Sequence, residues 1–249
     1  MINTLAGRRM AITGAGRGLG AALAIVAADR GARPLLLGRQ PANLKATGDT
    51  IRKRTGIDAP TIACDLADRA SAAAAASMIA ATHADIDGII HNGTMWLPGP
   101  LEQLDDAQME SCIASAAVGA LVLTRRLLPL LKAKPRADIH TVVSTSGLPN
   151  VPLLGASVAF RAAKAAQDGF VQGLADELSG TTVRVSAVYP GNITDLSPLD
   201  AEWDAARGPD DPLTNREVVE AVLFTLALPA NACVRSLVIE RSRSELFRR

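Results

Sequence analysis

The sequence predicts an α/β fold in which one doubly wound parallel β-sheet carries helices on both faces. Short apolar runs alternate with longer helical patterns along the whole chain, as they do when βαβ units build a parallel sheet. A glycine-dense octapeptide at 13–20 separates the first apolar run from the first helical pattern. The 249 residues suit one domain of this class, and no linker or change of composition divides them. We therefore expect a single domain over residues 1–249.

Seven short apolar runs are predicted to form the strands. The run 34–38 (Pro-Leu-Leu-Leu-Gly) is continuously apolar, which is typical of a parallel strand buried on both faces. The run 183–188 alternates between apolar and other residues and is also predicted as a strand. In order, the predicted strands cover residues 10–13, 34–38, 61–64, 86–90, 139–144, 183–188 and 237–239.

Helical patterns fill most of the intervals between these runs. Gly31 closes the first of them, as glycine commonly does after a helix. The alanine-rich stretch 72–76 is explained by the high helix propensity of alanine. A long amphipathic pattern follows, and we expect it to break near Pro129 and Pro135. The predicted helices cover residues 19–30, 41–54, 68–81, 107–131, 157–178 and 215–228, with loops at 95–100 and 207–212.

Composition and charge narrow the functional classes. The formal net charge is +1, which argues against general binding to nucleic acid or to a membrane surface. No apolar signal segment precedes the first strand, and no uninterrupted apolar run approaches the length of a membrane span, so we expect neither. Cys64, Cys112 and Cys233 lack metal-ligand spacing, so we expect no metal site and three reduced core cysteines. We expect a cytoplasmic protein.

The octapeptide 13–20, Thr-Gly-Ala-Gly-Arg-Gly-Leu-Gly, is the motif that points most directly to a ligand. It lies between a predicted strand and a predicted helix, which is the context that a dinucleotide site requires. Glycines let the backbone turn tightly and approach a pyrophosphate, whose charge the amides at the helix N-terminus stabilise. Taken alone, the octapeptide could also be a flexible turn.

Other distinctive short sequences also follow predicted strands. In doubly wound sheets ligands bind beyond the carboxyl ends of the strands, so motifs at these positions share one edge of the sheet. Their coincidence is stronger support for a binding site than any one motif. The sequences concerned are 13–20, Gly38–Arg39, Asp65–Leu66, His91–Asn92–Gly93, 144–146 and Pro190–Gly191.

With these motifs the chain resembles the short-chain dehydrogenase/reductase family, single-domain Rossmann-fold enzymes that use a nicotinamide cofactor. The match covers nearly the whole chain, although the family's usual Asn-Asn-Ala-Gly is here His-Asn-Gly-Thr at 91–94. The resemblance implies that Asp65 contacts the adenine and that Asn92–Gly93 lie along the ribose. The cofactor-binding residues that it implies are Gly14, Arg17, Gly18, Leu19, Gly20, Arg39, Asp65, Leu66, Asn92, Gly93, Lys164, Pro190, Gly191 and Ile193.

Charge at the second strand end favours NADP(H) over NAD(H). In the family an acid at this position usually holds the ribose hydroxyls of NAD, whereas basic residues favour the phosphate of NADP. Here Gly38 takes the acid's place, Arg39 follows it, and Arg17 lies in the glycine loop. A guanidinium suits a phosphate because it donates two parallel hydrogen bonds. The alternative is that both arginines are only solvated.

The family's catalytic residues are incompletely represented. The resemblance implies a tyrosine as general acid or base, four residues before the catalytic Lys164 and on the same helix face. Phe160 stands there, and Tyr189 is the only tyrosine in the chain. Ala116 stands where the family has an asparagine that holds a proton-relay water.

The family's catalytic serine has three candidates. Ser146 lies nearest to the family's separation from the tyrosine position, while Thr145 and Ser144 are close competitors. Tyr189 and His91, each beside a strand end, are hypothetical substitutes for the missing acid. The alternative is that Tyr189 belongs to the core or rim and that His91 is an ordinary loop residue.

We expect an NADP(H)-dependent oxidoreductase that acts on a small carbonyl or alcohol substrate through an atypical site. A catalytically silent NADP-binding protein and a non-redox enzyme on the same fold are the alternatives. The resemblance also implies a homodimer or homotetramer formed through the helices 107–131 and 157–178, and a variable substrate lid near 195–211 containing Trp203. Small residues would allow close packing of those helices between subunits or only on their own sheet: Ala114, Ala116, Ala117, Ala159, Ala162 and Ala163.

Overall fold

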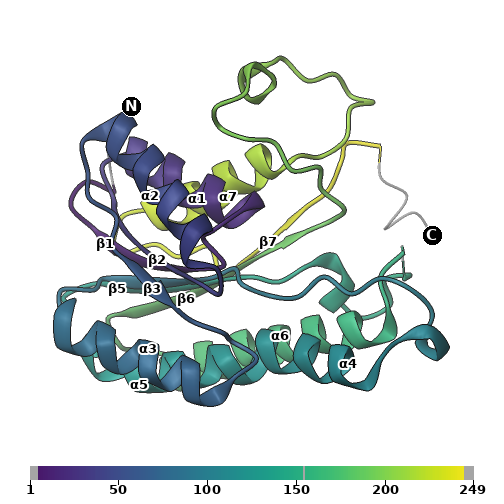
Figure 1. Cartoon of the computed structure of the whole chain (residues 1–249), viewed down its shortest axis with the longest axis horizontal. Helices are drawn as coiled ribbons and strands as arrows, with labels where there is room; N and C mark the ends of the chain where they lie inside the picture. The colour runs from purple at the N-terminus through teal and green to yellow at the C-terminus, as the bar shows by residue number, and fades with distance from the viewer. Residues whose placement is uncertain (1–4, 154, 244–249) are drawn as a thin grey trace.

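The computed structural model describes residues 5–153 and 155–243, and it confirms the doubly wound α/β fold. Seven strands form one parallel sheet in the order β3-β2-β1-β4-β5-β6-β7 (Figure 1). The strands are β1 (Arg9–Thr13), β2 (Arg33–Gly38), β3 (Thr61–Ala63), β4 (Gly88–His91), β5 (Ala137–Val142), β6 (Val183–Pro190) and β7 (Ser236–Ile239).

Helices cover both faces of this sheet, as Figure 1 shows. The helices α1 (Gly18–Asp29), α2 (Pro41–Thr55) and α7 (Asn215–Ala227) lie on one face. The other face carries α3 (Arg69–Thr82), α4 (Asp106–Ile113), α5 (Gly119–Lys132) and α6 (Val158–Glu177). Short 3₁₀ turns occupy Leu101–Gln103, Thr145–Gly147 and Ala201–Asp204.

Burial on both faces explains the continuously apolar second strand. Leu36 packs into the core on the α1 and α7 side, whereas Leu35 and Leu37 pack into the core on the α3 and α5 side. Successive side chains of a strand point to opposite faces, so a covered parallel strand needs apolar residues at every position. The sheet is therefore a rigid support for the loops at its carboxyl edge.

The predicted helix at 107–131 forms as three consecutive segments. A π-helical segment, Ala114–Val118, separates α4 from α5. Pro129 lies inside α5 and does not end it, so the predicted break there is wrong; the helix ends at Lys132, before Pro135. Pro129 lies on the exposed side, where water can satisfy a backbone carbonyl that the proline leaves without a donor.

The same run corrects the expectation about membrane spans. Asp106–Lys132 is long and apolar enough to cross a membrane by length and composition alone. In the structure α5 packs on α3 and against β4 and β5, so many of its apolar residues face the sheet. The helix is apolar because it covers a core, although Leu121 on its outer side is exposed.

The small residues of the two long helices pack first within the chain. Ala116 of the π segment and Ala159 and Ala163 of α6 are buried in one apolar cluster with Phe160. Ala162 is exposed. Close packing between these helices therefore serves their own subunit, and a role of the exposed positions in assembly stays a prediction.

One of the three cysteines lies outside the core. Cys64 and Cys112 are buried, as expected, but Cys233 is exposed. It lies in the connection between α7 and β7, at the edge of the sheet. The prediction that all three are core residues is therefore wrong for Cys233.

Strand β5 begins two residues earlier than predicted and brings a buried carboxylate into the sheet. Asp138 pairs with Arg8 and Arg184, each at 2.7 Å, and with Arg136 at 3.5 Å. These arginines also donate to the carbonyl of Leu226 at the end of α7. A charged residue fits inside the sheet here because three cations surround it.

Candidate functional site

A cavity of about 850 Å³ opens at the carboxyl ends of the strands. Its walls come from the residues that follow β1, β2, β3, β4, β5 and β6, together with α6. All fourteen predicted cofactor-binding residues line this cavity, as do Ser146 and Phe160. The tertiary structure thus brings together every predicted site residue, although their separate roles stay predictions.

The glycine loop leaves its backbone open to a ligand. Gly14 and Gly18 have φ angles of 68° and 51°, which residues other than glycine rarely adopt. A Cβ at Gly14 would lie 2.8 Å from the Cα of Gly93, and a Cβ at Gly20 would collide with the carbonyl of Gly14. Arg17 precedes α1 without a side-chain cap, so the first amides of α1 face the cavity without a side-chain acceptor. This cradle fits a dinucleotide.

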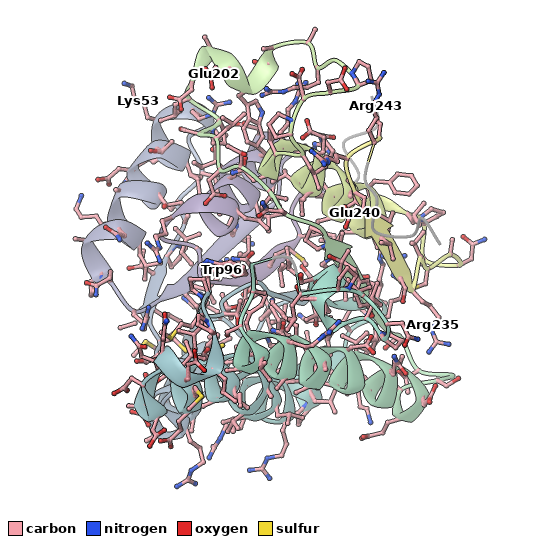
Figure 2. The ribbon with its side chains drawn as sticks, turned by 90° about the vertical axis from the view of Figure 1, so that its right-hand side faces the viewer. Lys53, Trp96, Glu202, Arg235, Glu240 and Arg243 are labelled. Atoms are coloured by element: carbon pink, nitrogen blue, oxygen red, sulfur yellow. The ribbon has the colours of Figure 1, made fainter. Side chains whose placement is uncertain are left out.

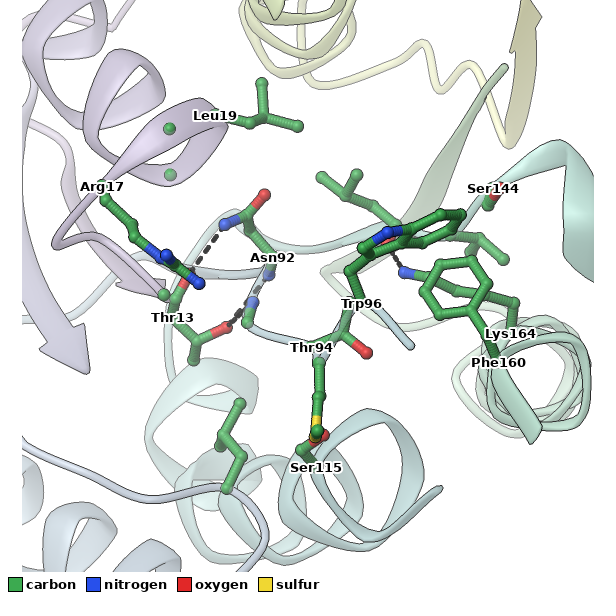
Figure 3. A pocket seen from close by; sticks show the side chains of 18 of the residues that line it. Thr13, Arg17, Leu19, Asn92, Thr94, Trp96, Ser115, Ser144, Phe160 and Lys164 are labelled. Atoms are coloured by element: carbon green, nitrogen blue, oxygen red, sulfur yellow. Dashed lines mark hydrogen bonds between the residues drawn. The ribbon is translucent and has the colours of Figure 1, made fainter. Parts of the chain in front are cut away.

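Thr13 and Asn92 hold the glycine loop against the next strand end. The Thr13 Oγ1 accepts hydrogen bonds from the backbone amides of Asn92 and Gly93, at 3.0 and 2.9 Å. The Asn92 Nδ2 donates to the Thr13 carbonyl at 3.2 Å (Figure 3). The Asn92 side chain therefore joins β4 to β1. A Cβ at the adjoining Gly93 would lie 2.9 Å from the Leu66 Cδ1 and 3.1 Å from the Gly14 nitrogen, so glycine allows this close approach.

The cationic end of the cavity carries Arg17 and Arg39, both largely exposed. Asp65 lies beyond them, with its Oδ1 accepting from the amide of Ala67 at 2.9 Å. Asn43, on the first turn of α2, also lines this end and packs against Gly16. Asn43 was not among the predicted site residues, because only the tertiary fold brings α2 against the glycine loop.

Lys164 lies at the opposite end of the cavity (Figure 3). Its Nζ donates to the carbonyl of Val142 at 3.1 Å and to the Gln167 Oε1 at 2.9 Å. Burial lowers the pKa of the Lys164 ammonium to about 7, and the neighbouring Cys112 thiol opposes this shift. Two of the three N–H groups of the charged amine are used within the protein, which leaves one for a ligand.

Phe160 and Trp96 form an aromatic wall beside this lysine. The Phe160 ring centroid lies 5.5 Å from the Lys164 Nζ (Figure 3). The Trp96 and Phe160 rings pack edge to face, with their centroids 4.7 Å apart. Trp96 is 54% exposed, although it is a large aromatic residue. Trp96 was predicted only as part of the loop 95–100. A tryptophan inside a predicted loop, shortly before Pro98 and Pro100, was the available signal.

Three hydroxyl side chains reach the same end from the turn after β5. Ser144, Thr145 and Ser146 all line the cavity. The Ser144 Oγ accepts a hydrogen bond from the Ser146 amide at 3.1 Å, and Arg161 donates to the Ser146 carbonyl at 3.4 Å. These contacts fix the turn. Ser146 as the catalytic hydroxyl stays a prediction, with the other two as its competitors.

The π segment forms part of the wall opposite the glycine loop. Ser115 lines the cavity, whereas its neighbour Ala116 is buried. The Ser115 Oγ donates to the carbonyl of Cys112 at 3.1 Å, so this hydroxyl is engaged within its own helix. π-Helical insertions often occur at functional sites, and this one places a serine at the cavity.

His91 does not face the cavity, so the hypothesis that it replaces the missing acid is not supported. Its ring is buried, with Nε2 2.7 Å from the Thr124 Oγ1 and the ring plane edge-on to Phe170. Burial, with a smaller contribution from His140, lowers the pKa of His91 to about 4. Alternation along β4 explains the outcome, because His91 points towards α5.

Tyr189 is also directed away from the cavity. It is buried in the core on the α6 side, and its hydroxyl donates to the Asp168 Oδ1 at 2.7 Å. Burial and the Asp168 carboxylate both raise the pKa of Tyr189. The next residue, Pro190, does line the cavity, because successive side chains of β6 point to opposite faces. Tyr189 is therefore a core residue and no substitute for the family tyrosine.

The segment after β6 contributes a carboxylate that the sequence reading did not place. Asp195 lines the cavity, and a Cβ at Gly18 would lie 2.6 Å from its Oδ2. Trp203, further along, is buried in the core with Leu213 and does not point into the cavity. A lid role for the segment near 195–211 stays a prediction.

Comparisons with known proteins agree with this arrangement. The sequence profile of the family described as short chain dehydrogenase matches residues 8–207. An uncharacterized oxidoreductase of Staphylococcus saprophyticus is 25% identical over 228 residues, which cover 92% of this chain and 94% of that protein. A metagenomic short-chain oxidoreductase, solved in complex with NADP, is 26% identical with a TM-score of 0.79, over 95% of this chain and 97% of that one. L-Sorbose reductase from Gluconobacter frateurii, complexed with NADPH and L-sorbose, shares the fold at 20% identity and a TM-score of 0.83, over 98% and 100% of the chains.

Proposed function

Since the chain belongs to the short-chain dehydrogenase family, we propose that it is an NADP(H)-dependent oxidoreductase acting on a carbonyl or alcohol substrate. The observation that carries the proposal is a single cavity that joins the glycine cradle to Lys164. Similar folds were solved with NADP or NADPH, which supports the choice of a nicotinamide cofactor. Bound there, the nicotinamide would supply or accept a hydride.

The glycine loop and the residues at the carboxyl ends of the strands would hold this cofactor. The open amides of α1 would bind the diphosphate, and Arg39 with Arg17 would bind the additional phosphate of NADP(H). Asp65 would accept a hydrogen bond from the adenine, since its Oδ1 bonds only the nearby Ala67 amide. Pro190, which also lines the cavity, would lie beside the nicotinamide.

The residues near Lys164 suggest an uncharged, largely apolar substrate. Met95, Trp96, Val151 and Phe160 line this end of the cavity, with hydroxyl groups from the turn after β5 as polar partners. Apolar walls with a few directed polar groups are typical of sites that bind small organic ligands. One of the three hydroxyls, Ser146 or its competitors, would orient the carbonyl oxygen.

Lys164 would supply the proton in place of the family tyrosine. Among the described ionisable side chains that line the cavity, Arg17, Arg39, Cys64 and Asp65 lie towards the cationic end and Asp195 lies over Gly18. Lys164 therefore remains to act at the aromatic end. Its ammonium would donate a proton to the carbonyl oxygen as the hydride reaches the carbonyl carbon, and the neutral amine would regain a proton from water. Acid–base catalysis is most efficient when the donor's pKa lies near the working pH.

This role predicts a specific pH profile. Because the pKa of Lys164 is lowered to about 7, the amine loses its proton as the pH rises above that value. We expect the rate of NADPH-dependent aldehyde reduction to fall by about tenfold per pH unit above pH 7 and to level off below it. Turnover of aryl and alkyl aldehydes between pH 5.5 and 9 tests this, with NADPH binding measured at the same pH values. A flat profile would exclude Lys164 as the proton donor.

Cofactor choice can be tested on Arg39. We expect Arg39→Ala to weaken NADPH binding by roughly 10- to 100-fold, because a hydrogen-bonded charge pair is lost, and to leave NADH binding unchanged. Fluorescence titration of both cofactors measures the effect. Arg52→Ala is the matched control, since Arg52 lies on α2, the helix that follows Arg39, but pairs with Asp58 outside the cavity lining. If Arg39→Ala loses the same affinity for NADPH and for NADH, Arg39 does not bind the additional phosphate.

A catalytically silent NADP-binding protein is the second candidate. The observation that favours it is the Phe160–Trp96 contact, which places apolar edges where a proton donor is expected. For this candidate, titration detects tight NADPH binding while no carbonyl compound is reduced. The Phe160 variant described in the Discussion separates the two functions.

We also propose that the protein acts in the cytoplasm as a homodimer or homotetramer. Ile113, Val118 and Leu121 of the α4–α5 run and Val158 of α6 are exposed apolar residues, which supports pairing through these helices. No nucleic acid or membrane partner is proposed.

A further inference from the structure

We propose that Asp195 sets the affinity for the cofactor by holding a negative charge at the position of its diphosphate. The inference rests on the proposed NADP(H) binding. A carboxylate there repels the diphosphate, so the protein binds the cofactor more weakly than its intact glycine cradle would allow. Asp195 is thus an affinity-determining residue outside the motifs that define the site.

The position of the carboxylate carries the proposal. A Cβ built on Gly18 would lie 2.6 Å from the Asp195 Oδ2 and 3.2 Å from its Cγ, so the carboxyl group lies directly against the first residue of α1. Asp195 also lines the cavity. The N-terminus of a helix at this edge of the sheet is where a diphosphate binds, because the helix dipole and the free amides both favour an anion.

Hydrogen bonds on both sides hold the backbone of Asp195 in place. The amide of Thr194 donates to the carbonyl of Leu213 at 2.9 Å, and the amide of Asn215 donates to the carbonyl of Thr194 at 3.1 Å. Leu196 makes two bonds with the Asn215 side chain, at 2.9 and 2.8 Å. Asn215 itself is fully buried. The segment is therefore anchored to the start of α7, and it presents the exposed Asp195 side chain to the cavity.

The charges around the cavity leave the Asp195 carboxylate free to repel a diphosphate. Arg17 and Arg39 bring positive charge to the same end, and no described residue forms a salt bridge with Asp195. The diphosphate carries two negative charges and would come within a few ångströms of the carboxylate. At that distance a like charge near a protein surface lowers affinity substantially.

Neutral substitutions at Asp195 test the inference. We expect Asp195→Asn to tighten NADPH and ADP binding by about tenfold or more, because the repulsion disappears while the side-chain size is kept. Binding of adenosine, which has no phosphate, stays unchanged. Asp195→Ser serves as a second variant with a smaller neutral side chain. Fluorescence titration of NADPH and calorimetry of ADP and adenosine give the affinities without any measurement of turnover.

The matched control is Glu202→Gln, which removes one negative charge from the outer end of the same segment (Figure 2). Glu202 is exposed and does not line the cavity. If wild-type protein binds NADPH and the Asp195 variants gain no more than this control, the inference is wrong while the proposed function stands. A gain that adenosine shares would also overturn it. If wild type and all variants fail to bind NADPH, the proposed function is wrong and the inference falls with it.

Discussion

Replacing Phe160 by tyrosine is expected to raise the rate of NADPH-dependent carbonyl reduction by roughly 10²- to 10⁴-fold, the usual contribution of a positioned general acid. Phe160 and Lys164 lie one helical turn apart on α6, with the ring centroid 5.5 Å from the Nζ. A tyrosine hydroxyl would therefore enter the cavity close to a cation. A nearby cation lowers the pKa of a phenol, which makes the proton easier to transfer at neutral pH.

The fold around this position should accept the hydroxyl. Phe160 lines the cavity and its edge meets the exposed Trp96, so the new oxygen is not forced into a closed core. Phe160 is only 5% exposed, so the change adds one polar atom at a buried position on the cavity wall and leaves the ring in place. We expect the thermal stability of the variant to stay within a few degrees of wild type.

Turnover of a panel of aldehydes and ketones with NADPH measures the effect of Phe160→Tyr. Phe160→Leu is a control that removes the ring without adding an acid, and it should give no gain. The double variant Phe160→Tyr with Lys164→Met should lose most of the gain, because the tyrosine then lacks its cation. If Phe160→Tyr binds NADPH normally but stays inactive, the silent binding protein becomes the favoured function.

The second large effect is expected at Asp138, where alanine should lower the free energy of unfolding by about 3–5 kcal/mol. The Asp138 side chain is only 2% exposed and pairs with Arg8 and Arg184 at 2.7 Å. Without it, these two guanidinium groups and that of Arg136 repel one another in a largely buried position. Their bonds to the carbonyl of Leu226 do not compensate, because a carbonyl carries only a partial charge.

Thermal and denaturant unfolding measure this loss. For a chain of this size the melting temperature should fall by roughly 6–20 °C, at 2–4 °C for each kcal/mol. Asp210→Ala is the control, since Asp210 pairs with Arg243 on the exposed surface and such pairs contribute only about 0–1 kcal/mol. A loss at Asp138 no greater than at Asp210 would show that the three arginines do not need the carboxylate.

Local patterns in the sequence were sufficient to predict the fold and the location of the site. Apolar runs such as 34–38 predicted buried parallel strands, because a strand covered on both faces needs apolar residues throughout. The octapeptide at 13–20 predicted the first turn, because the positive φ angles at Gly14 and Gly18 and the close approach of Gly14 to Gly93 require glycine. Since the carboxyl ends of parallel strands share one edge, these motifs had to meet.

Tertiary structure alone decided the direction of individual side chains and the contacts between distant segments. His91 and Tyr189 lie at the carboxyl ends of β4 and β6, where the site was predicted. The pleat directs His91 towards α5 and Tyr189 towards α6, so both side chains point away from the cavity. Asp195 is about 180 residues from Gly18 in the sequence, and the bonds of its neighbours Thr194 and Leu196 to Leu213 and Asn215 hold the segment that brings its carboxylate to the start of α1. Local periodicity and turn chemistry act over a few residues, so the sequence by itself determined the parallel sheet, the order of strands and helices along the chain, and the edge of the sheet at which the motifs meet. Packing between distant segments determined which charges line the cavity.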